Sequence, residues 1–431
     1  MAWSVRSGVM LTLASLMILT GCGGATTDSD TSETVTLIVW DELTGAAGDA
    51  AERVYADFSE AFPEIRIERR LVADEEEPAD LRTALASGTG PDVLGYVVDT
   101  EHELLFEQGL LAPLNLIPAR YGWSQQLDPV ARQWLTKDNR LFGLPVGIEF
   151  SGLYVNTTLA EGLGEDPPRT YASLLDLCAL AAPQGISAMA LSDDGANGSP
   201  QLFGMVLNNL LGPDLTAALL FAEWSRWDTS RVARASRIIA SEMPAAGCGT
   251  PADVVPSEEE AIARFGAGQT LLLPVSSGQW AEIAASAPFE TTFISFPNID
   301  NGQGRVIPTR VVAAYGLAAK SAYPRQAARF LNYLLSEEAA QVWAGVGGLT
   351  PAVESDAATW NLPPLHETML DLAEAARRPF GPDLGYRLDS GLPAPFEVAI
   401  AESLRAVQVG EASPAQVASQ LERLWRSRDP P

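Results

Sequence analysis

The stretch LFGLPVGIEFSGLYVN, residues 141–156, decides the expected fold. Its residues favour β-structure, but it is longer than one ordinary strand, and glycine and proline interrupt it. An extended run with such breaks is expected where a chain passes from one packed unit into the next. We therefore interpret this stretch as a strand that crosses between two lobes.

Segments on either side of this crossing alternate between strand and helix patterns. Upstream, the expected elements are a strand at 34–40, a helix at 49–62, a strand at 65–67, a helix ending at 81–86 and a strand at 93–98. This alternation predicts an α/β fold with an open, mostly parallel sheet, whose ligand crevice lies beyond the carboxyl ends of the strands.

Downstream segments continue the same pattern. We expect strands at 270–275 and 293–297, the second leading into another crossing, then one long helix at 325–342 and a third crossing after 345–348. The C-terminal part is expected to be helical. There Ser413 and Gln416 have the spacing of a capping box.

The N-terminus has the pattern of an export signal. Arg6 precedes a short apolar run at 9–19, and the sequence then reads LTGC, ending at Cys22. This resembles the bacterial lipoprotein signal, which implies cleavage after residue 21 and a lipid on Cys22. The alternative is an ordinary signal peptide with a chance cysteine. Residues 22–33 are small and polar, which predicts a flexible tether.

Composition excludes some functions. The net charge of −27 argues against nucleic-acid binding, which relies on basic patches. The remaining cysteines, Cys178 and Cys248, are either a disulfide or two buried thiols. The two histidines, His102 and His366, lie in no zinc-binding or nucleophile motif. We therefore expect no metal and no cofactor.

Six blocks resemble, in order, the bacterial extracellular solute-binding proteins of ABC importers, in the carbohydrate-binding group that includes maltodextrin-binding protein. The blocks are VTLIVW (35–40), DFSEAFPEIRIERR (57–70), LRTALASGTGPDVLGYV (81–97), NRLFGLPVGIEFSGLYVNTTLAEGLGEDPPRTYASLL (139–175), EEAIARFGAGQTLLLPVSSGQW (259–280) and YPRQAARFLNYLLSEEAAQVWAGVGGLTPA (323–352). The resemblance implies two α/β lobes joined by crossing hinge strands, with the ligand cleft between them. The implied lobes are 34–147 with 296–346, and 148–295 with 347–431.

A sugar site needs aromatic planes for the ring faces, and carboxylates, amides or arginines for the hydroxyls. The resemblance places Trp280 in the family's Gly-x-Trp motif, where it would stack on a sugar; a core or surface role is the alternative. The further candidates, each of which also has a purely structural interpretation, are Trp40, Asp41 and Glu42 after the first strand, Glu149 in the crossing, Arg310, and Phe396 with Glu397 on a late helix.

The resemblance implies a monomeric, lipid-anchored receptor outside the cytoplasm, at the cell surface or in the periplasm. It would capture a carbohydrate by hinge closure, without catalysis, and deliver it to membrane permease subunits. One alternative is a secreted glycoside hydrolase that uses paired carboxylates. Another is the same fold binding a polyamine or another small solute, for which Asp41 and Glu42 would be suitable.

Overall fold

The computed structural model describes residues 34–72, 78–98, 100–117, 121–192, 198–222, 225–378 and 381–427. The predicted signal peptide, Cys22 and the predicted tether lie outside these residues. The account below concerns the body that begins at Thr34.

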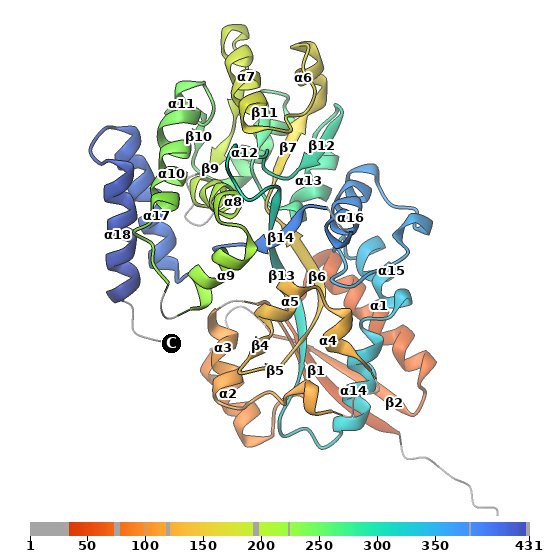
Figure 1. Cartoon of the computed structure of the whole chain (residues 1–431). Helices are drawn as coiled ribbons and strands as arrows, with labels where there is room; N and C mark the ends of the chain where they lie inside the picture. Colours follow the sequence, from red (N-terminus) through yellow and green to blue (C-terminus); the bar gives the residue numbers. More distant parts are fainter. Residues whose placement is uncertain are drawn as a thin grey trace, which may run out of the picture. The chain divides into compact units, whose positions relative to one another are not determined.

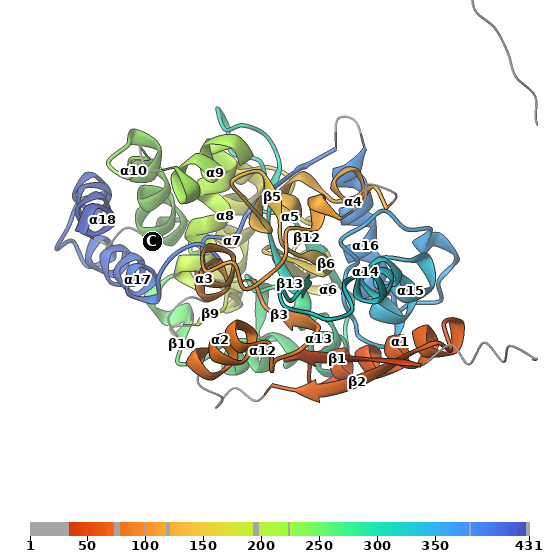
Figure 2. The same cartoon turned by 90° about the horizontal axis from the view of Figure 1, so that it is seen from below.

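The first sheet has the strand order β14-β13-β3-β1-β2, with β6 also paired to β13 (Figures 1 and 2). Its strands are β1 (Val35–Asp41), β2 (Ile65–Leu71), β3 (Val93–Tyr96), β6 (Leu144–Phe150), β13 (Val306–Leu317) and β14 (Asp383–Tyr386). The strand β1 runs parallel to β2 and β3, as the sequence predicts, whereas β13 runs antiparallel to β3 and β6.

The second sheet has the order β12-β7-β11-β8. Its strands are β7 (Leu153–Asn156), β8 (Ser187–Met189), β11 (Thr270–Leu273) and β12 (Thr291–Ile294). Two further pairs are short: β4 (Thr136–Lys137) with β5 (Arg140–Leu141), and β9 (Leu191–Ser192) with β10 (Val254–Val255).

Helices surround both sheets (Figure 1). They are α1 (Gly45–Ala61), α2 (Pro78–Ser87), α3 (Thr100–Glu107), α4 (Trp123–Gln126), α5 (Pro129–Trp134), α6 (Thr157–Gly162), α7 (Tyr171–Ala181), α8 (Ser199–Leu211), α9 (Pro213–Phe221), α10 (Ser230–Arg237), α11 (Met243–Ala245), α12 (Glu258–Gly266), α13 (Trp280–Ser286), α14 (Pro324–Tyr333), α15 (Glu337–Gly345), α16 (Pro364–Arg377), α17 (Ala394–Gln408) and α18 (Pro414–Ser427). Within the described ranges no single helix is long and apolar enough to span a membrane; α8 and α9 meet that criterion only as a pair bent by 120°.

The crossing predicted at 141–156 is confirmed. The strand β6 belongs to the first sheet and β7 to the second, and the chain changes sheets at Ser151 and Gly152. A Cβ atom on Gly152 would lie 2.5 Å from the carbonyl oxygen of Ile294, so only glycine fits at this point. The chain returns to the first sheet between β12 and β13, and a bridge between Ile148 and Thr350 places a third segment against β6.

The predicted lobe ranges follow these crossings and remain a prediction, but two details of the sheets differ from them. The strand β6 stays in the first sheet as far as Phe150, and β14, which the prediction places in the second lobe, pairs with β13. Asn208 on α8 holds β14 from its other side, since its side chain exchanges hydrogen bonds of 2.9 and 3.0 Å with the Tyr386 backbone.

The predicted helix at 325–342 is wrong in one respect, because the structure divides it into α14 and α15. Ser336 lies at the break, and its Oγ accepts a hydrogen bond from the backbone N–H of Ala339. Serine in this position competes with helix continuation by capping a new helix. The capping box predicted at Ser413 and Gln416 is confirmed by two reciprocal hydrogen bonds.

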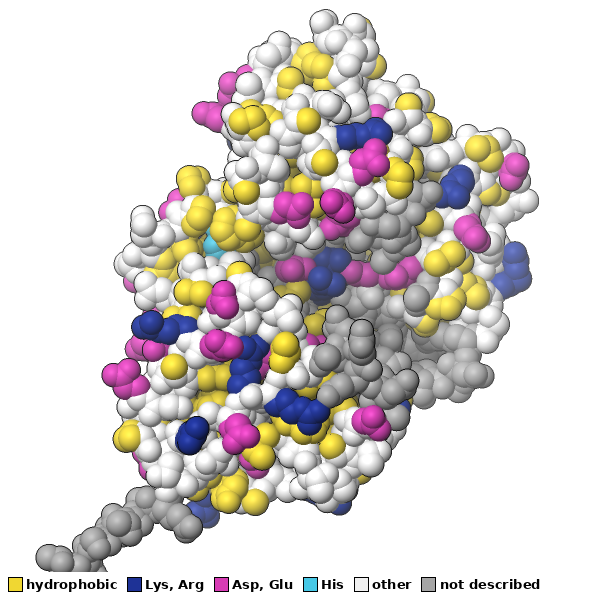
Figure 3. Space-filling model, turned by 180° about the vertical axis from the view of Figure 1, so that it is seen from behind, with side chains coloured by type: hydrophobic (Ala, Val, Ile, Leu, Met, Phe, Trp, Pro, Cys, Tyr) yellow, Lys and Arg dark blue, Asp and Glu magenta, His cyan; other side chains and the backbone are white. Residues whose placement is uncertain are grey.

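The back face of the molecule carries both signs of charge. On the face shown in Figure 3, lysine and arginine side chains are scattered among aspartate and glutamate rather than gathered in one patch.

Candidate functional site

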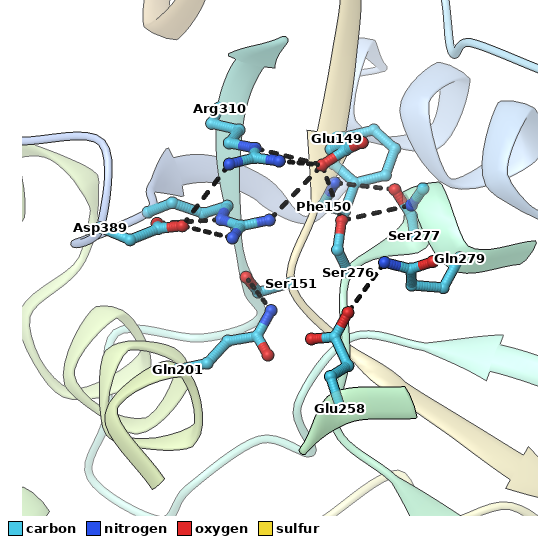
Figure 4. Close-up of polar contacts among 12 residues, drawn as sticks. Glu149, Phe150, Ser151, Gln201, Glu258, Ser276, Ser277, Gln279, Arg310 and Asp389 are labelled. Atoms are coloured by element: carbon cyan, nitrogen blue, oxygen red, sulfur yellow. Dashed lines mark hydrogen bonds and ion pairs between the residues drawn. The ribbon is translucent and has the colours of Figure 1, made fainter. Parts of the chain in front are cut away.

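Glu149 is the centre of a polar cluster at the first crossing (Figure 4). Its Oε2 accepts hydrogen bonds from Nε and Nη2 of Arg310 at 3.1 and 2.9 Å, and from Oγ of Ser276 at 2.8 Å. Glu149 and Arg310 face each other in the register of β6 and β13, whereas Ser276 follows β11 of the second sheet. One carboxylate therefore links the first sheet to a loop of the second.

Arg387 and Asp389 complete the cluster from the segment after β14. Arg387 is 4% exposed and donates from Nε to Oδ1 of Asp389 at 3.0 Å, while its Nη1 lies 3.6 Å from Oε2 of Glu149. Arg310 Nη1 lies 3.8 Å from Oδ2 of Asp389. Burial opposes ionisation of Asp389, but Arg387 and then Arg310 outweigh it and lower the pKa of this carboxyl. The positive charges of Arg310 and Arg387 thus offset the negative charges of Glu149 and Asp389.

Amide and hydroxyl groups from α8 and from the loops after β6 and β11 lie around this cluster (Figure 4). Gln279 donates from Nε2 to Glu258 at 2.8 Å, and Gln201 donates from Nε2 to the hydroxyl of Ser151 at 3.3 Å. Carboxylates, amides and guanidinium groups together can both accept hydrogen bonds from hydroxyl groups and donate to them. The cluster is therefore chemically suited to a polyhydroxylated solute.

The absence of a side chain at Gly278 leaves space for the carboxylate of Glu149. Gly278 is exposed, and a Cβ atom at this position would lie 2.2 Å from Oε1 of Glu149. We expect Gly278→Ala to push the Glu149 carboxylate away from Ser276 and Arg310 and to weaken solute binding about tenfold, since it disturbs a charge-assisted hydrogen bond. Isothermal titration measures this loss. The matched control is Gly162→Ala, because nothing lies within 4 Å of a Cβ there; equal affinities of the two variants would contradict the expectation.

Trp280 lies close along the chain to this cluster, at the start of α13. Its ring is half-buried and stacks on His366 of α16, with centroids 4.5 Å apart and planes inclined by 16°. Its Nε1 donates to the carbonyl oxygen of Gly348 at 2.9 Å. Burial lowers the pKa of His366 to about 4, so this ring is uncharged at neutral pH. His366 covers one face of Trp280, and the exposed part of the indole keeps it a candidate for stacking on a solute.

Asp41 has a structural role, and we no longer assign it to the solute site. It is 0% exposed, and both of its carboxylate oxygens bind Arg69, at 2.7 and 2.9 Å. Tyr55 also donates to Oδ2 at 2.9 Å and is itself 2.8 Å from the hydroxyl of Tyr315. These contacts leave no exposed oxygen for a ligand.

Trp40 is likewise unsuited to the solute site, because its ring is buried. Its side chain is 8% exposed, and the guanidinium group of Arg70 lies 4.2 Å from the centroid of its ring. The ring is thus buried and covered by a cation, so it offers no free plane to a sugar. Glu42 is half-buried beside them and remains a prediction.

Phe396 packs in the core, which overturns its assignment to the ligand. It is 3% exposed and packs against Trp227 and Trp425, with ring centroids 4.7 and 5.6 Å away. Its neighbour Glu397 is half-buried and lines a small cavity together with Arg387 and Asp389. Burial and then the charge of Asp389 raise the pKa of Glu397 to about 8.

The cysteine alternatives are settled by geometry. Cys178 on α7 and Cys248 after α11 are joined in a disulfide, with Cα atoms 5.4 Å apart and both side chains 0% exposed. As regards metals, the described residues contain no group of three or more histidine, cysteine, aspartate and glutamate side chains arranged to hold an ion.

Sequence reasoning missed three of the five residues of the cluster. Arg387 and Asp389 belong to no motif that we recognised, and Ser276 lies in the block 259–280 without having been named as a candidate. The only available signal was the pair of opposite charges in RLDSG, 387–391, before a predicted helix. Only the pairing of β14 with β13 brings this pair next to Glu149.

Comparison with known protein families identifies a matching family. A family model described as "Bacterial extracellular solute-binding protein" matches residues 53–367. The chain belongs to this family. No curated protein sequence matches this solute-binding protein.

Many solved structures share its fold. A probable secreted solute-binding lipoprotein from Streptomyces coelicolor is similar with a TM-score of 0.76 at 17% identity, covering 93% of this chain and 100% of that one. A cyclic α-maltosyl-1,6-maltose-binding protein from Arthrobacter globiformis gives 0.71 at 21% identity, covering 90% and 97%. The apo form of RafE from Streptococcus pneumoniae gives 0.72 at 17% identity, covering 91% and 97%. The predicted two-lobed α/β fold is confirmed.

Proposed function

We propose that this protein is a lipid-anchored extracytoplasmic receptor that binds a carbohydrate between its lobes and delivers it to the permease subunits of an ABC transporter. The observation that carries the proposal is the Glu149 cluster, which gathers polar groups from both sheets at the crossing strands. Membership of an extracellular family supports the location. Similar structures named for a chitin oligosaccharide, a cyclic maltooligosaccharide and raffinose support the ligand class.

The charge of the cluster favours a neutral solute over a polyamine. Glu149 and Asp389 are each paired with arginine, and Asp41 is neutralised by Arg69. A polycation would have to compete with these fixed guanidinium groups for the carboxylates. A sugar hydroxyl can instead bind at the rim of an ion pair, where it accepts from arginine and donates to a carboxylate.

Binding would act through closure of the lobes. A solute held by Glu149 and Arg310 on one side, and by Trp280 or Gln279 on the other, has its full set of contacts only when the lobes are together. The differential affinity for the closed form then shifts the population toward it. The permease would recognise that form, and a lipid on Cys22 would keep the monomeric receptor close to its transporter.

A glycoside hydrolase remains the second candidate, since one observation favours it. Asp389 is ionised, whereas the raised pKa of Glu397 keeps that group mostly protonated at neutral pH, and such an unequal pair is used in acid–base and nucleophilic attack on glycosides. Asp389 is held by two arginines, however, which makes it a weak nucleophile.

One experiment separates these functions. Isothermal titration of the protein lacking residues 1–21, with Cys22→Ala, against raffinose, maltotriose, xylotriose and chitotriose should show binding of one class, and chromatography should show the sugar intact. We expect Glu149→Gln to lose about 10- to 100-fold in affinity and Trp280→Ala about tenfold, from a charge-assisted hydrogen bond and a stacking contact. Glu161→Gln, on the exposed surface of α6, is the control. Release of shorter sugars would favour the hydrolase.

A further inference from the structure

Glu397 contributes a third carboxyl group to the cluster. It lines the same small cavity as Arg387 and Asp389, and this cavity has at most about the room that one water molecule needs. The immediate cluster contains three carboxyl groups, those of Glu149, Asp389 and Glu397, but only two guanidinium groups, those of Arg310 and Arg387. The third carboxyl therefore has no cation of its own.

We propose that Glu397 holds a proton behind the solute site and that its neutral form positions Arg387 and Asp389 for binding, so that solute affinity falls when this proton is lost. The inference rests on the proposed function and adds a positioning residue to it. It also predicts how that function depends on pH.

The contacts of Arg387 explain why ionisation would disturb the site. Its Nη1 is buried and has no hydrogen-bond partner among the described residues, although it lies 3.6 Å from Glu149. An ionised Glu397 would attract this atom. Arg387 would then move away from Asp389 and Glu149, the two groups that it holds in place for the solute.

The groups around Glu397 decide its protonation. Asp389 on the preceding loop disfavours the ionised form, and Arg387 on the same loop only partly offsets this effect. Glu149 on β6 and Arg310 on β13 neutralise each other. The helix α8 contributes Gln201, which is uncharged, to the wall of the cavity. The net effect raises the pKa of Glu397 to about 8, mainly through burial.

The test compares the wild-type protein with Glu397→Gln, which keeps the shape of the protonated acid. If binding requires the protonated form, a pKa of about 8 predicts that wild-type affinity falls about tenfold between pH 7 and pH 9. Titrations with the sugars named above should show this fall, whereas the affinity of Glu397→Gln should stay level. Glu402→Gln, an exposed carboxyl on the same helix, should keep the wild-type pH dependence.

A second readout needs no sugar. Because Glu397 binds its proton more tightly in the folded state than in the unfolded state, wild-type stability should fall relative to Glu397→Gln as the pH rises from about 4.5 to about 8, and the difference should be constant above that range. Thermal unfolding over pH 4.5–9 measures this difference. Parallel pH profiles for the two proteins would overturn the inference. If no sugar binds at any pH while the stability profiles diverge, the proposed function fails and the protonation of Glu397 stands.

Discussion

Asp41→Ala is expected to destabilise the protein by about 3–5 kcal/mol, the cost of removing one partner from a buried ion pair. The substitution would leave the guanidinium group of Arg69 without the two oxygens that it binds at 2.7 and 2.9 Å. It would also remove the carboxylate that accepts the hydrogen bond of the buried Tyr55 hydroxyl. Urea unfolding followed by tryptophan fluorescence measures the change.

Glu52→Gln is the control for this prediction. Glu52 is the other carboxylate partner of Arg69, but its side chain is 71% exposed, so its loss should cost less than about 1 kcal/mol. Solute affinity per folded molecule should be the same in the Asp41 variant and the wild type. A stable Asp41→Ala protein that no longer bound sugar would restore Asp41 to the solute site and refute the structural role assigned to it.

Removal of the disulfide between Cys178 and Cys248 is the other change with a large expected effect. The bond joins residues separated by 70 positions in the sequence. A loop of this length restricts the unfolded chain enough to predict a loss of about 4 kcal/mol in the Cys178→Ala, Cys248→Ala double variant. Differential scanning calorimetry of both proteins, without reductant, measures the loss.

The matching control is the wild-type protein without its disulfide. It is reduced under denaturing conditions, left unalkylated and refolded in excess reductant. Its stability should fall to nearly that of the double variant, because both proteins lack the same link. Equal stability of the oxidised and reduced wild-type proteins would show that the bond does not restrain the unfolded chain. Both sulfur atoms are buried, so the folded protein should resist reduction by mild thiols.

The main course of the fold could be predicted because hydrophobic pattern and chain breaks coincide. The stretch 141–156 predicts a crossing since it is too long and too interrupted for one strand, and Gly152 proves to be the point where the chain changes sheets. The division of 325–342 was missed because Ser336, a helix cap, stands inside an otherwise continuous helical pattern. A single capping residue is hard to recognise in the sequence when the apolar periodicity continues on both sides of it.

The candidate site was predictable only in part, because its members meet through tertiary structure. Glu149 and Arg310, both named from the sequence, prove to be hydrogen-bonded partners. Asp41 was a reasonable candidate by its position after the first strand. Its partner Arg69 lies 28 residues further on, and nothing in the sequence shows that the two will form a buried pair. Arg387 and Asp389 reach the site only through β14.

If the lobes close as proposed, the short strand β14 lies where the molecule would bend. It pairs with β13 at Val306–Thr309, and the backbone N–H of Ser151 donates to Pro308 in the same region. The strands β13 and β14 and the segment at Ser151 are thus joined within a few residues. Asn208 of α8 connects a fourth segment to them through its hydrogen bonds with β14. A rotation about any more distant point would break several of these bonds together. Under the proposed closure, the lobes would therefore rotate about this small region in the same way each time a solute binds.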